Sequence, residues 1–205
     1  MTDPTSPPVP EDLWAGEFGD AYVQRNAVLD ERRHVFWAGI HTDLALDSVL
    51  EVGCGQGANL APLAQLLGPA RVWGVDINRA SLARAAVNAP GVNLAEGSAR
   101  SLPFDDRRFD LVFTVGVLIH QPPEYLPQVL DEIVRTSRRY VLAAEYHADE
   151  PVELEYRGKR GALFKRDYRQ IFTERFPELT LLRTGFLDRD AGFDRVTYAL
   201  FERAP

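Results

Sequence analysis

The sequence predicts an α/β fold: a doubly wound, mostly parallel seven-stranded sheet with an antiparallel C-terminal hairpin. The first observation is that short apolar segments alternate with segments of helical periodicity between residues 48 and 144. This order is expected of parallel strands that are covered by helices on both faces. The second is that two apolar segments near the C-terminus flank a turn, residues 188–192, that contains aspartate and glycine. Such an arrangement is typical of a hairpin.

The N-terminal part divides into a leader and a helical region. Residues 1–12 are expected to be a disordered leader, because four prolines within the first ten residues disfavour regular structure. In residues 13–45 the apolar spacing predicts helices from Leu13 to Asn26 and from Val28 to His41. Residues 13–205 are expected to form one domain, since a chain of this length buries a single core.

Residues 46–145 form the predicted core, in which strands and helices alternate. The expected strands run from Ser48 to Val52, Arg71 to Val75, Val92 to Ala95, Phe109 to Val115 and Tyr140 to Ala144. The expected helices run from Ala58 to Leu67, Ser81 to Asn88 and Glu124 to Thr136.

The C-terminal part begins with residues 146–177, an insertion followed by a helix. It starts as an irregular charged stretch up to Arg157 and ends in a helix from Phe164 to Phe176. Residues 178–205 contain the two strands of the hairpin, from Leu179 to Leu187 and from Arg195 to Glu202.

Composition and charge narrow the expected binding partners and the expected cellular compartment. Acidic residues outnumber basic ones, 30 to 23, so the net charge is −7 and nucleic acid is not an expected partner. The N-terminus lacks the basic start and apolar run of a signal peptide, and no apolar run reaches membrane-spanning length. The single cysteine, Cys54, cannot form an internal disulfide, and no histidine or cysteine cluster suggests a metal. We therefore expect a cytoplasmic protein without membrane attachment.

The most informative motif is a glycine loop that follows the first strand. Glu51 precedes glycines at positions 53, 55 and 57, and Asp76 ends the next expected strand. The spacing is G-x-G-x-G, which differs from the dinucleotide pattern G-x-G-x-x-G, and no Gly-Lys-Ser/Thr of a P-loop follows. A carboxylate at the end of the second strand can accept both hydroxyl protons of a ribose. The loop thus indicates a nucleoside cofactor; the alternative is a tight strand-to-helix turn.

This E-x-G-x-G-x-G motif resembles the first motif of class I S-adenosylmethionine-dependent methyltransferases. The resemblance implies a Rossmann-like methyltransferase fold, with S-adenosylmethionine as cofactor and S-adenosylhomocysteine as product. It also implies that Glu51 and the loop face the methionine moiety and that Asp76 binds the ribose. Ser98 lies where many relatives have an acid that accepts the adenine amine, and its hydroxyl accepts more weakly; the alternative is a polar turn. The cofactor-contacting residues expected on this basis are Glu51, Gly53, Gly55, Asp76, Ile77, Ser98, Ala99 and Gly116.

Three further segments resemble the methylases associated with pseudaminic acid biosynthesis. They are residues 13–26, the Gly-Val-Leu-Ile-His-Gln-Pro segment 116–122, and residues 156–158 together with 163–168. In small-molecule methyltransferases the N-terminal helices cover the cofactor, so residues 13–45 are expected to form a lid. Tyr22, Arg25 and Asn26 are then cofactor or substrate contacts. The alternative is that the aromatic residues of this helix only pack against the core.

His120 is the candidate catalytic residue, and a basic group after the fifth core strand is the candidate acceptor site. His120 follows the fourth strand, at the sheet edge where ligands collect, and either removes a proton from the acceptor or binds a loop carbonyl. The basic residues suggest an acceptor with a carboxylate or phosphate; the alternative is a solvated face. The expected acceptor contacts are Tyr146, His147, Tyr156, Arg157, Lys165 and Arg166.

The sequence thus leads to a small-molecule O- or N-methyltransferase acting on a sugar, a peptide or another biosynthetic intermediate. An alternative from another class is an inactive cofactor-binding protein that engages an acidic partner through residues 157–166. A weaker alternative is an RNA methyltransferase, which the acidic composition disfavours.

Overall fold

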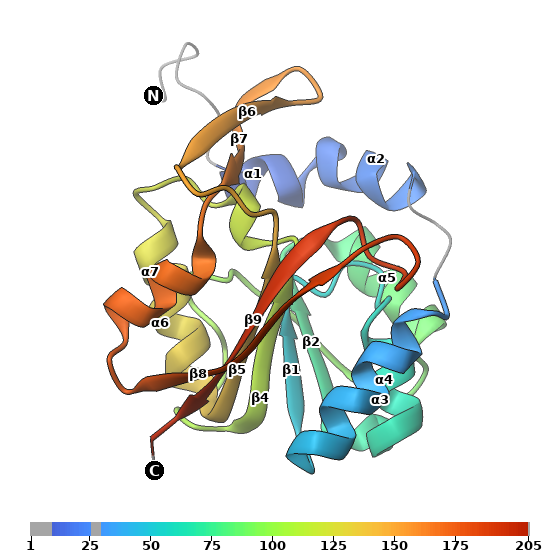
Figure 1. The fold of residues 1–205 in the computed structure, drawn as a ribbon. Helices are drawn as coiled ribbons and strands as arrows, with labels where there is room; N and C mark the ends of the chain where they lie inside the picture. Colours follow the sequence, from blue (N-terminus) through green and yellow to red (C-terminus); the bar gives the residue numbers. More distant parts are fainter. Residues whose placement is uncertain (1–9, 26–29, 205) are drawn as a thin grey trace.

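A seven-stranded sheet with the strand order β3-β2-β1-β4-β5-β9-β8 lies at the centre of the computed structural model, which describes residues 10–25 and 30–204 (Figure 1). Strands β1 to β5 are parallel neighbours, whereas β9 pairs antiparallel with both β5 and β8. The doubly wound sheet with its C-terminal hairpin is therefore confirmed. The strands are β1 Val49–Val52, β2 Val72–Asp76, β3 Asn93–Glu96, β4 Phe109–Val115, β5 Ser137–Glu145, β8 Leu179–Leu187 and β9 Val196–Arg203.

Helices cover both faces of the sheet. Strand β1 carries Val49 into the core beneath α3 and α4, and its neighbour Leu50 into the core beneath α6 and α7. This alternation follows from the two-residue period of a strand, which is why the parallel strands read as continuous apolar runs. The helices are α3 Arg33–Leu44, α4 Leu60–Leu67, α5 Arg79–Asn88, α6 Leu126–Thr136 and α7 Tyr168–Arg175, with short 3-10 turns η1 Pro69–Arg71 and η2 Leu118–His120.

The strand order reverses at β1, which has β2 on one side and β4 on the other. At such a point the connections leave the sheet in opposite directions and open a crevice at the carboxyl ends of the strands. The glycine loop follows β1 and Asp76 ends β2, so both lie at this crevice.

The N-terminal region differs from the single helix expected over Leu13 to Asn26. Two helices form, α1 Pro10–Ala15 and α2 Glu17–Arg25, with a bend at Gly16, a residue of low helix propensity. Helix α1 also begins inside the leader expected for residues 1–12. Both helices lie across one end of the sheet (Figure 1). The second expected helix, from Val28 to His41, is observed as α3, which begins and ends later.

The irregular stretch expected after β5 was predicted wrongly. Residues 152–165 form a second, two-stranded sheet made of β6 Val152–Tyr156 and β7 Lys159–Lys165, next to α1 at the top of Figure 1. Its loop is Arg157-Gly158, with φ angles of 51° and 77°, as the favoured two-residue hairpin turns require. The following helix starts at Tyr168 rather than Phe164, because the Asp167 carboxylate caps it by accepting the Gln170 N–H at 2.9 Å.

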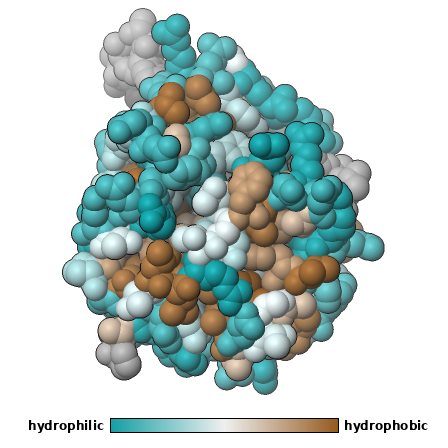
Figure 2. All heavy atoms as spheres, viewed as in Figure 1, coloured by the Kyte–Doolittle hydropathy of each residue, from teal (hydrophilic) through white to brown (hydrophobic). Residues whose placement is uncertain are grey.

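The surface is largely hydrophilic, with hydrophobic side chains visible among polar ones on the face shown in Figure 2. Exposed hydrophobic residues of the edge strand β8 include Leu181, Leu182 and Phe186. Within residues 10–25 and 30–204, no helix combines the length and hydrophobicity that crossing a bilayer requires.

Candidate active site

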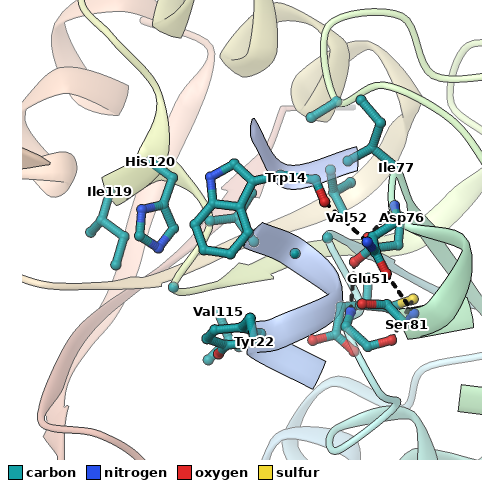
Figure 3. A pocket seen from close by; sticks show the side chains of 18 of the residues that line it. Trp14, Tyr22, Glu51, Val52, Asp76, Ile77, Ser81, Val115, Ile119 and His120 are labelled. Carbon is teal, nitrogen blue, oxygen red and sulfur yellow. Dashed lines mark hydrogen bonds between the residues drawn. The ribbon is translucent and has the colours of Figure 1, made fainter. Parts of the chain in front are cut away.

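A cavity of about 750 Å³ lies at the carboxyl ends of β1, β2 and β4, and residues of α1 and α2 line it as well (Figure 3). It brings together residues from segments that are far apart in the sequence, which is what the crevice at the strand-order reversal predicts. The residues expected from the sequence that line it are Tyr22, Arg25, Glu51, Gly53, Gly55, Asp76, Ile77, Ala99, Gly116, His120, Tyr146, Tyr156 and Arg157.

The glycine loop has the conformation that its sequence predicts. Gly53, Gly55 and Gly57 all have positive φ angles, of 71°, 51° and 80°, which only glycine adopts without strain. A Cβ on Gly53 would lie 2.5 Å from the Val117 side chain, so this position also needs glycine for packing. A Cβ on Gly55 would meet nothing within 4 Å and would stand in the cavity. The loop therefore leaves room for a ligand to lie against its backbone.

Asp76 is fixed by backbone donors on both sides of its carboxylate. The Gly55 N–H donates to Oδ2 and the Asn78 N–H donates to Oδ1, each at 2.8 Å. Burial raises the pKa of Asp76, while these hydrogen bonds act in the opposite direction. The carboxylate is thus oriented at the cavity wall, and each oxygen retains a further lone pair for a ligand hydroxyl.

Glu51 is buried and holds one free oxygen. Its Oε1 accepts the Asn59 Nδ2–H at 2.6 Å, whereas Oε2 is buried without a hydrogen-bond partner among the described residues. Burial raises the pKa of Glu51 to about 8. Asn59 is itself held by donors from Arg33 at 3.0 Å and Trp37 at 3.1 Å. An unpaired buried carboxylate oxygen that lines a cavity is suited to a cationic ligand group.

The segment after β3 differs from the expectation for Ser98. Gly97 and Ala99 line the cavity, but Ser98 does not, because its hydroxyl bonds to the carboxylate of Glu11 on α1. Arg100 forms an ion pair with the same carboxylate. Burial raises the pKa of Glu11, but the hydrogen bonds from Arg100 and Ser98 outweigh this and lower it. An acid is therefore present at this end of the cavity, supplied by the N-terminal helix.

His120 lies between the cavity and the β6–β7 hairpin. Its Nδ1 is 2.6 Å from the Ala162 carbonyl oxygen, and since a carbonyl only accepts, Nδ1 carries the proton and Nε2 has the free lone pair. Burial lowers the pKa of the imidazole to about 4, so it is neutral near pH 7. The loop that carries His120 is positioned by Glu145, whose oxygens accept the N–H groups of Val117 at 3.2 Å and Ile119 at 3.3 Å.

The expected acceptor residues separate into two groups. Tyr146, Tyr156 and Arg157 line the main cavity, and the Tyr146 hydroxyl donates to Asp194 at 2.5 Å. His147 and Arg166 instead line a separate hollow of about 240 Å³ beside α7. Arg166 is 5% exposed and donates to the Gln121 carbonyl at 3.0 Å, so it braces the loop after His120.

Lys165 lies over the Tyr146 ring, 5.6 Å from its centroid, and does not line the cavity. The expectation that Lys165 and Arg166 face the acceptor side was therefore wrong, because Lys165 packs on the Tyr146 ring and Arg166 is buried against the Gln121 carbonyl. Asn26, the remaining expected contact, lies outside the described residues.

Several cavity residues were not expected from the sequence. Glu11 and Arg33 reach the cavity from the N-terminal helices α1 and α3, which are separate in sequence from the glycine loop. Asn59 and Asn78 reach it from the starts of α4 and α5. Of these four residues, only Asn78 stands in a recognisable local pattern, because a polar residue directly before a helix typically caps it. Its Oδ1 accepts the Ser81 N–H at 2.7 Å. The part of the chain that the structure describes contains no group of three or more His, Cys, Asp or Glu side chains arranged to hold a metal ion.

Comparison with known proteins finds a matching family and similar sequences. Residues 49–139 match a family described as a methyltransferase domain. Over 100 residues the chain is 38% identical to a phthiotriol/phenolphthiotriol dimycocerosates methyltransferase of Mycobacterium ulcerans, a match that covers 48% of this chain and 36% of that protein. The chain thus spans only about a third of the length of this relative. A demethylmenaquinone methyltransferase of Anoxybacillus flavithermus is 29% identical over 181 residues, covering 82% of this chain and 75% of that protein.

Solved structures share the fold over nearly the whole chain. A magnesium protoporphyrin IX methyltransferase from Synechocystis, with bound S-adenosylhomocysteine, has a TM-score of 0.70 at 18% identity and covers 95% of this chain and 98% of its own. A 1,6-didemethyltoxoflavin N1-methyltransferase from Burkholderia thailandensis also has a TM-score of 0.70 at 18% identity, covering 100% and 94%. Residues 49–139 thus match a methyltransferase domain, and the chain as a whole shares the fold of these solved methyltransferases.

Proposed function

We propose that this chain transfers a methyl group from S-adenosylmethionine to an oxygen or nitrogen of a small-molecule acceptor. The observation that carries the proposal is that Glu51, the glycine loop and Asp76 line one cavity together with His120 and Arg157. One half of the cavity therefore has the groups for a nucleoside cofactor, and the other half has room and polar groups for a second ligand.

The residues present fit the cofactor. Gly55 leaves open space beside its backbone, and Glu51 has a buried oxygen without a partner among the described residues. The free Glu51 oxygen would accept from the ammonium of the methionine moiety, and Asp76 would accept from the ribose hydroxyls. Glu11, held ionised by Arg100, would accept the adenine amine in place of an acid at position 98. Ile77, Ala99 and Gly116 would contact the cofactor through packing.

The bound cofactor would supply an electrophilic methyl group, which bonds to the acceptor oxygen or nitrogen while sulfur keeps the electron pair of the broken bond. The chain's part is to align the acceptor and to exclude water. His120 is placed to accept the acceptor's proton at Nε2, because Nδ1 is already committed to Ala162. Tyr22 and Arg25 on α2 close the cavity from the lid side.

The acceptor is a small molecule whose identity the relatives do not fix. The curated relatives are named as methyltransferases of phthiotriol and phenolphthiotriol dimycocerosates and of demethylmenaquinone. The fold neighbours are named as methyltransferases of magnesium protoporphyrin IX and of 1,6-didemethyltoxoflavin. Arg157 lines the cavity and forms no ion pair with a described residue, so an anionic substituent on the acceptor would be recognised there. A sugar or peptide intermediate, and membership of the pseudaminic acid-associated subgroup, remain hypotheses. The buried free thiol of Cys54 favours a cytoplasmic location.

The test is transfer of a labelled methyl group. The purified protein is incubated with methyl-labelled S-adenosylmethionine and pooled small-molecule extracts, and the label is followed by chromatography. Label in a new small-molecule product, lost in Asp76→Ala, supports the proposal. Binding of S-adenosylhomocysteine without any transfer would instead favour the inactive cofactor-binding protein, and label in added RNA would favour the RNA methyltransferase.

A further inference from the structure

The acceptor half of the cavity has a wall of aromatic rings that come from three separate segments. Trp14 on α1 is central: its ring centroid lies 5.5 Å from Tyr22, 4.4 Å from His120 and 6.4 Å from Tyr156. Figure 3 shows the Trp14 and His120 rings side by side, with Tyr22 near them. Rings at these separations are in contact and form one continuous surface. The lid, the turn η2 and the β6–β7 hairpin therefore meet through aromatic groups at the acceptor side.

Two polar atoms of this wall lack partners within the described residues. Trp14 Nε1 is buried and donates no hydrogen bond to a described residue, and the hydrogen bond that His120 makes uses Nδ1, which leaves Nε2 free. Leaving a buried donor unpaired is unfavourable, so the unpaired Trp14 Nε1 calls for an explanation. A ligand with an oxygen that both accepts and donates would satisfy these two atoms.

Two arginines lie beside this wall. Arg157, at the hairpin turn, lies over the Tyr156 ring at 5.7 Å, and Arg25 lies over the Phe18 ring at 6.0 Å. Neither forms an ion pair with a described residue, whereas the acid on this side, Asp194, accepts the Tyr146 hydroxyl. The rim of the aromatic wall is thus suited to an anionic substituent.

We propose that the acceptor is a planar aromatic compound that carries a ring hydroxyl and a carboxylate. This inference rests on the proposed function and names its substrate class. The flat ring stacks on the wall around Trp14, the hydroxyl faces His120, and the carboxylate faces Arg157. A polyhydroxylated sugar fits less well, because each hydroxyl buried against these rings without a partner carries the same unpaired-group cost. A flexible aliphatic chain gains burial but none of the ring-to-ring attraction.

The experiment compares two probes that share a carboxylate and hydroxyls and differ in the ring. 3,4-Dihydroxybenzoate and glucuronate are titrated by calorimetry into the full chain, with and without saturating S-adenosylhomocysteine. We expect dihydroxybenzoate to bind at least about ten-fold more tightly than glucuronate, a difference that corresponds to about 1.4 kcal/mol. Equal binding of the two probes, tighter binding of glucuronate, or binding of neither overturns the inference.

Variants locate the binding to the aromatic wall. Tyr156→Leu should weaken dihydroxybenzoate binding about ten-fold, as the loss of an aromatic pair and of buried area predicts, and leave S-adenosylhomocysteine affinity unchanged. The matched control is Phe186→Leu, which removes a 55% exposed ring on β8 that does not line the cavity. Unchanged binding in Tyr156→Leu also overturns the inference. If S-adenosylhomocysteine does not bind, the proposed function itself is wrong. If it binds and the labelled methyl group passes to a non-aromatic acceptor, only the inference about the acceptor is wrong.

Discussion

Asn78 connects the carboxylate of Asp76 to the N-terminal helices. Its backbone N–H donates to Asp76 at 2.8 Å, and its side-chain Nδ2 donates to the Trp14 carbonyl at 3.1 Å and to the Asp20 carboxylate at 2.9 Å. The close approach of α2 requires glycine at position 19, where a Cβ would lie 1.9 Å from the Trp14 carbonyl oxygen. The same residue thus contacts the Asp76 carboxylate and holds α1 and α2 against the start of α5.

Asn78→Asp separates these two roles. The substituted carboxylate still caps α5 through an oxygen, but it loses the Nδ2 donor and repels Asp20. We expect faster hydrogen exchange in α1 and α2 with little change in α5. In Asn78→Ala the cap is lost too, which destabilises the protein by about 1 kcal/mol. Unchanged exchange of α1 and α2 in Asn78→Asp would show that the lid is held by other contacts.

Glu51 predicts a pH dependence of cofactor binding. Burial raises its pKa to about 8, so the carboxyl is protonated in the free protein at pH 6–7. A cationic ligand favours the ionised form, so binding releases a proton and affinity rises with pH up to about 8, at most ten-fold per unit. Calorimetry with S-adenosylhomocysteine in buffers of different ionisation enthalpy measures this proton. The prediction is contradicted if Glu51→Gln shows the same pH dependence.

The stability of the free protein should show the corresponding trend. For an acid whose folded pKa is raised, the stabilising contribution is complete below the unfolded pKa, near 4.5, and is lost as the pH rises through the folded value. Glu51 and Glu145, with pKa values raised by burial to about 8 and about 7, both act in this direction. The free energy of unfolding of Glu51→Gln should therefore fall less between pH 5 and 8 than that of the unchanged protein.

Site residues could be predicted from the sequence where the motif that marks them lies within one short segment of the chain. The glycine loop and Asp76 were predicted because their spacing relative to two apolar strands is contained within 28 residues, from Val49 to Asp76. The β6–β7 hairpin was missed because β6 is largely exposed and carries acidic residues, so its pattern resembled a solvated loop. Only the glycine of its two-residue turn was a signal for a hairpin.

The other site residues could not be predicted, because their positions depend on contacts between segments that are distant in the sequence. Ser98 was expected to bind the adenine, but it does not line the cavity and bonds instead to Glu11, and no local pattern links these two residues. Arg166 was expected in the acceptor site because it follows Arg157 and Lys165 in sequence, yet it is buried against the Gln121 carbonyl. Which side of the sheet a side chain faces depends on packing that sequence proximity does not encode.

Arg157 and Arg166 should respond differently to substitution. Arg157→Ala should raise the acceptor's KM about ten-fold with little effect on stability, because its exposed side chain lines the cavity. Arg166→Ala should instead lower the free energy of unfolding, since it leaves the Gln121 carbonyl unpaired. The control is Arg160→Ala, an exposed arginine of the same hairpin. An unchanged KM in Arg157→Ala would show that Arg157 belongs to a solvated face and does not bind the acceptor.

His120→Ala should lower kcat by about 100-fold if Nε2 takes the acceptor's proton, with small effects on KM. The pKa of His120 is lowered to about 4 by burial, so protonation of this group should reduce kcat only near pH 4 and leave it flat from pH 6 to 8. His147→Ala is the matched control, because His147 lines the separate hollow. Near-normal kcat in His120→Ala would leave this histidine only its hydrogen bond to Ala162.

The most direct test of the account is a calorimetric titration of S-adenosylhomocysteine into the unchanged protein and into Asp76→Ala. We predict one site per chain, and an affinity that falls about 10- to 150-fold in the variant, because charge-assisted ribose hydrogen bonds worth about 1.5–3 kcal/mol are lost. Asp105→Ala, at an exposed position away from the cavity, should bind as tightly as the unchanged protein. No binding to the unchanged protein, or equal affinity in Asp76→Ala, would contradict the assignment of this cavity.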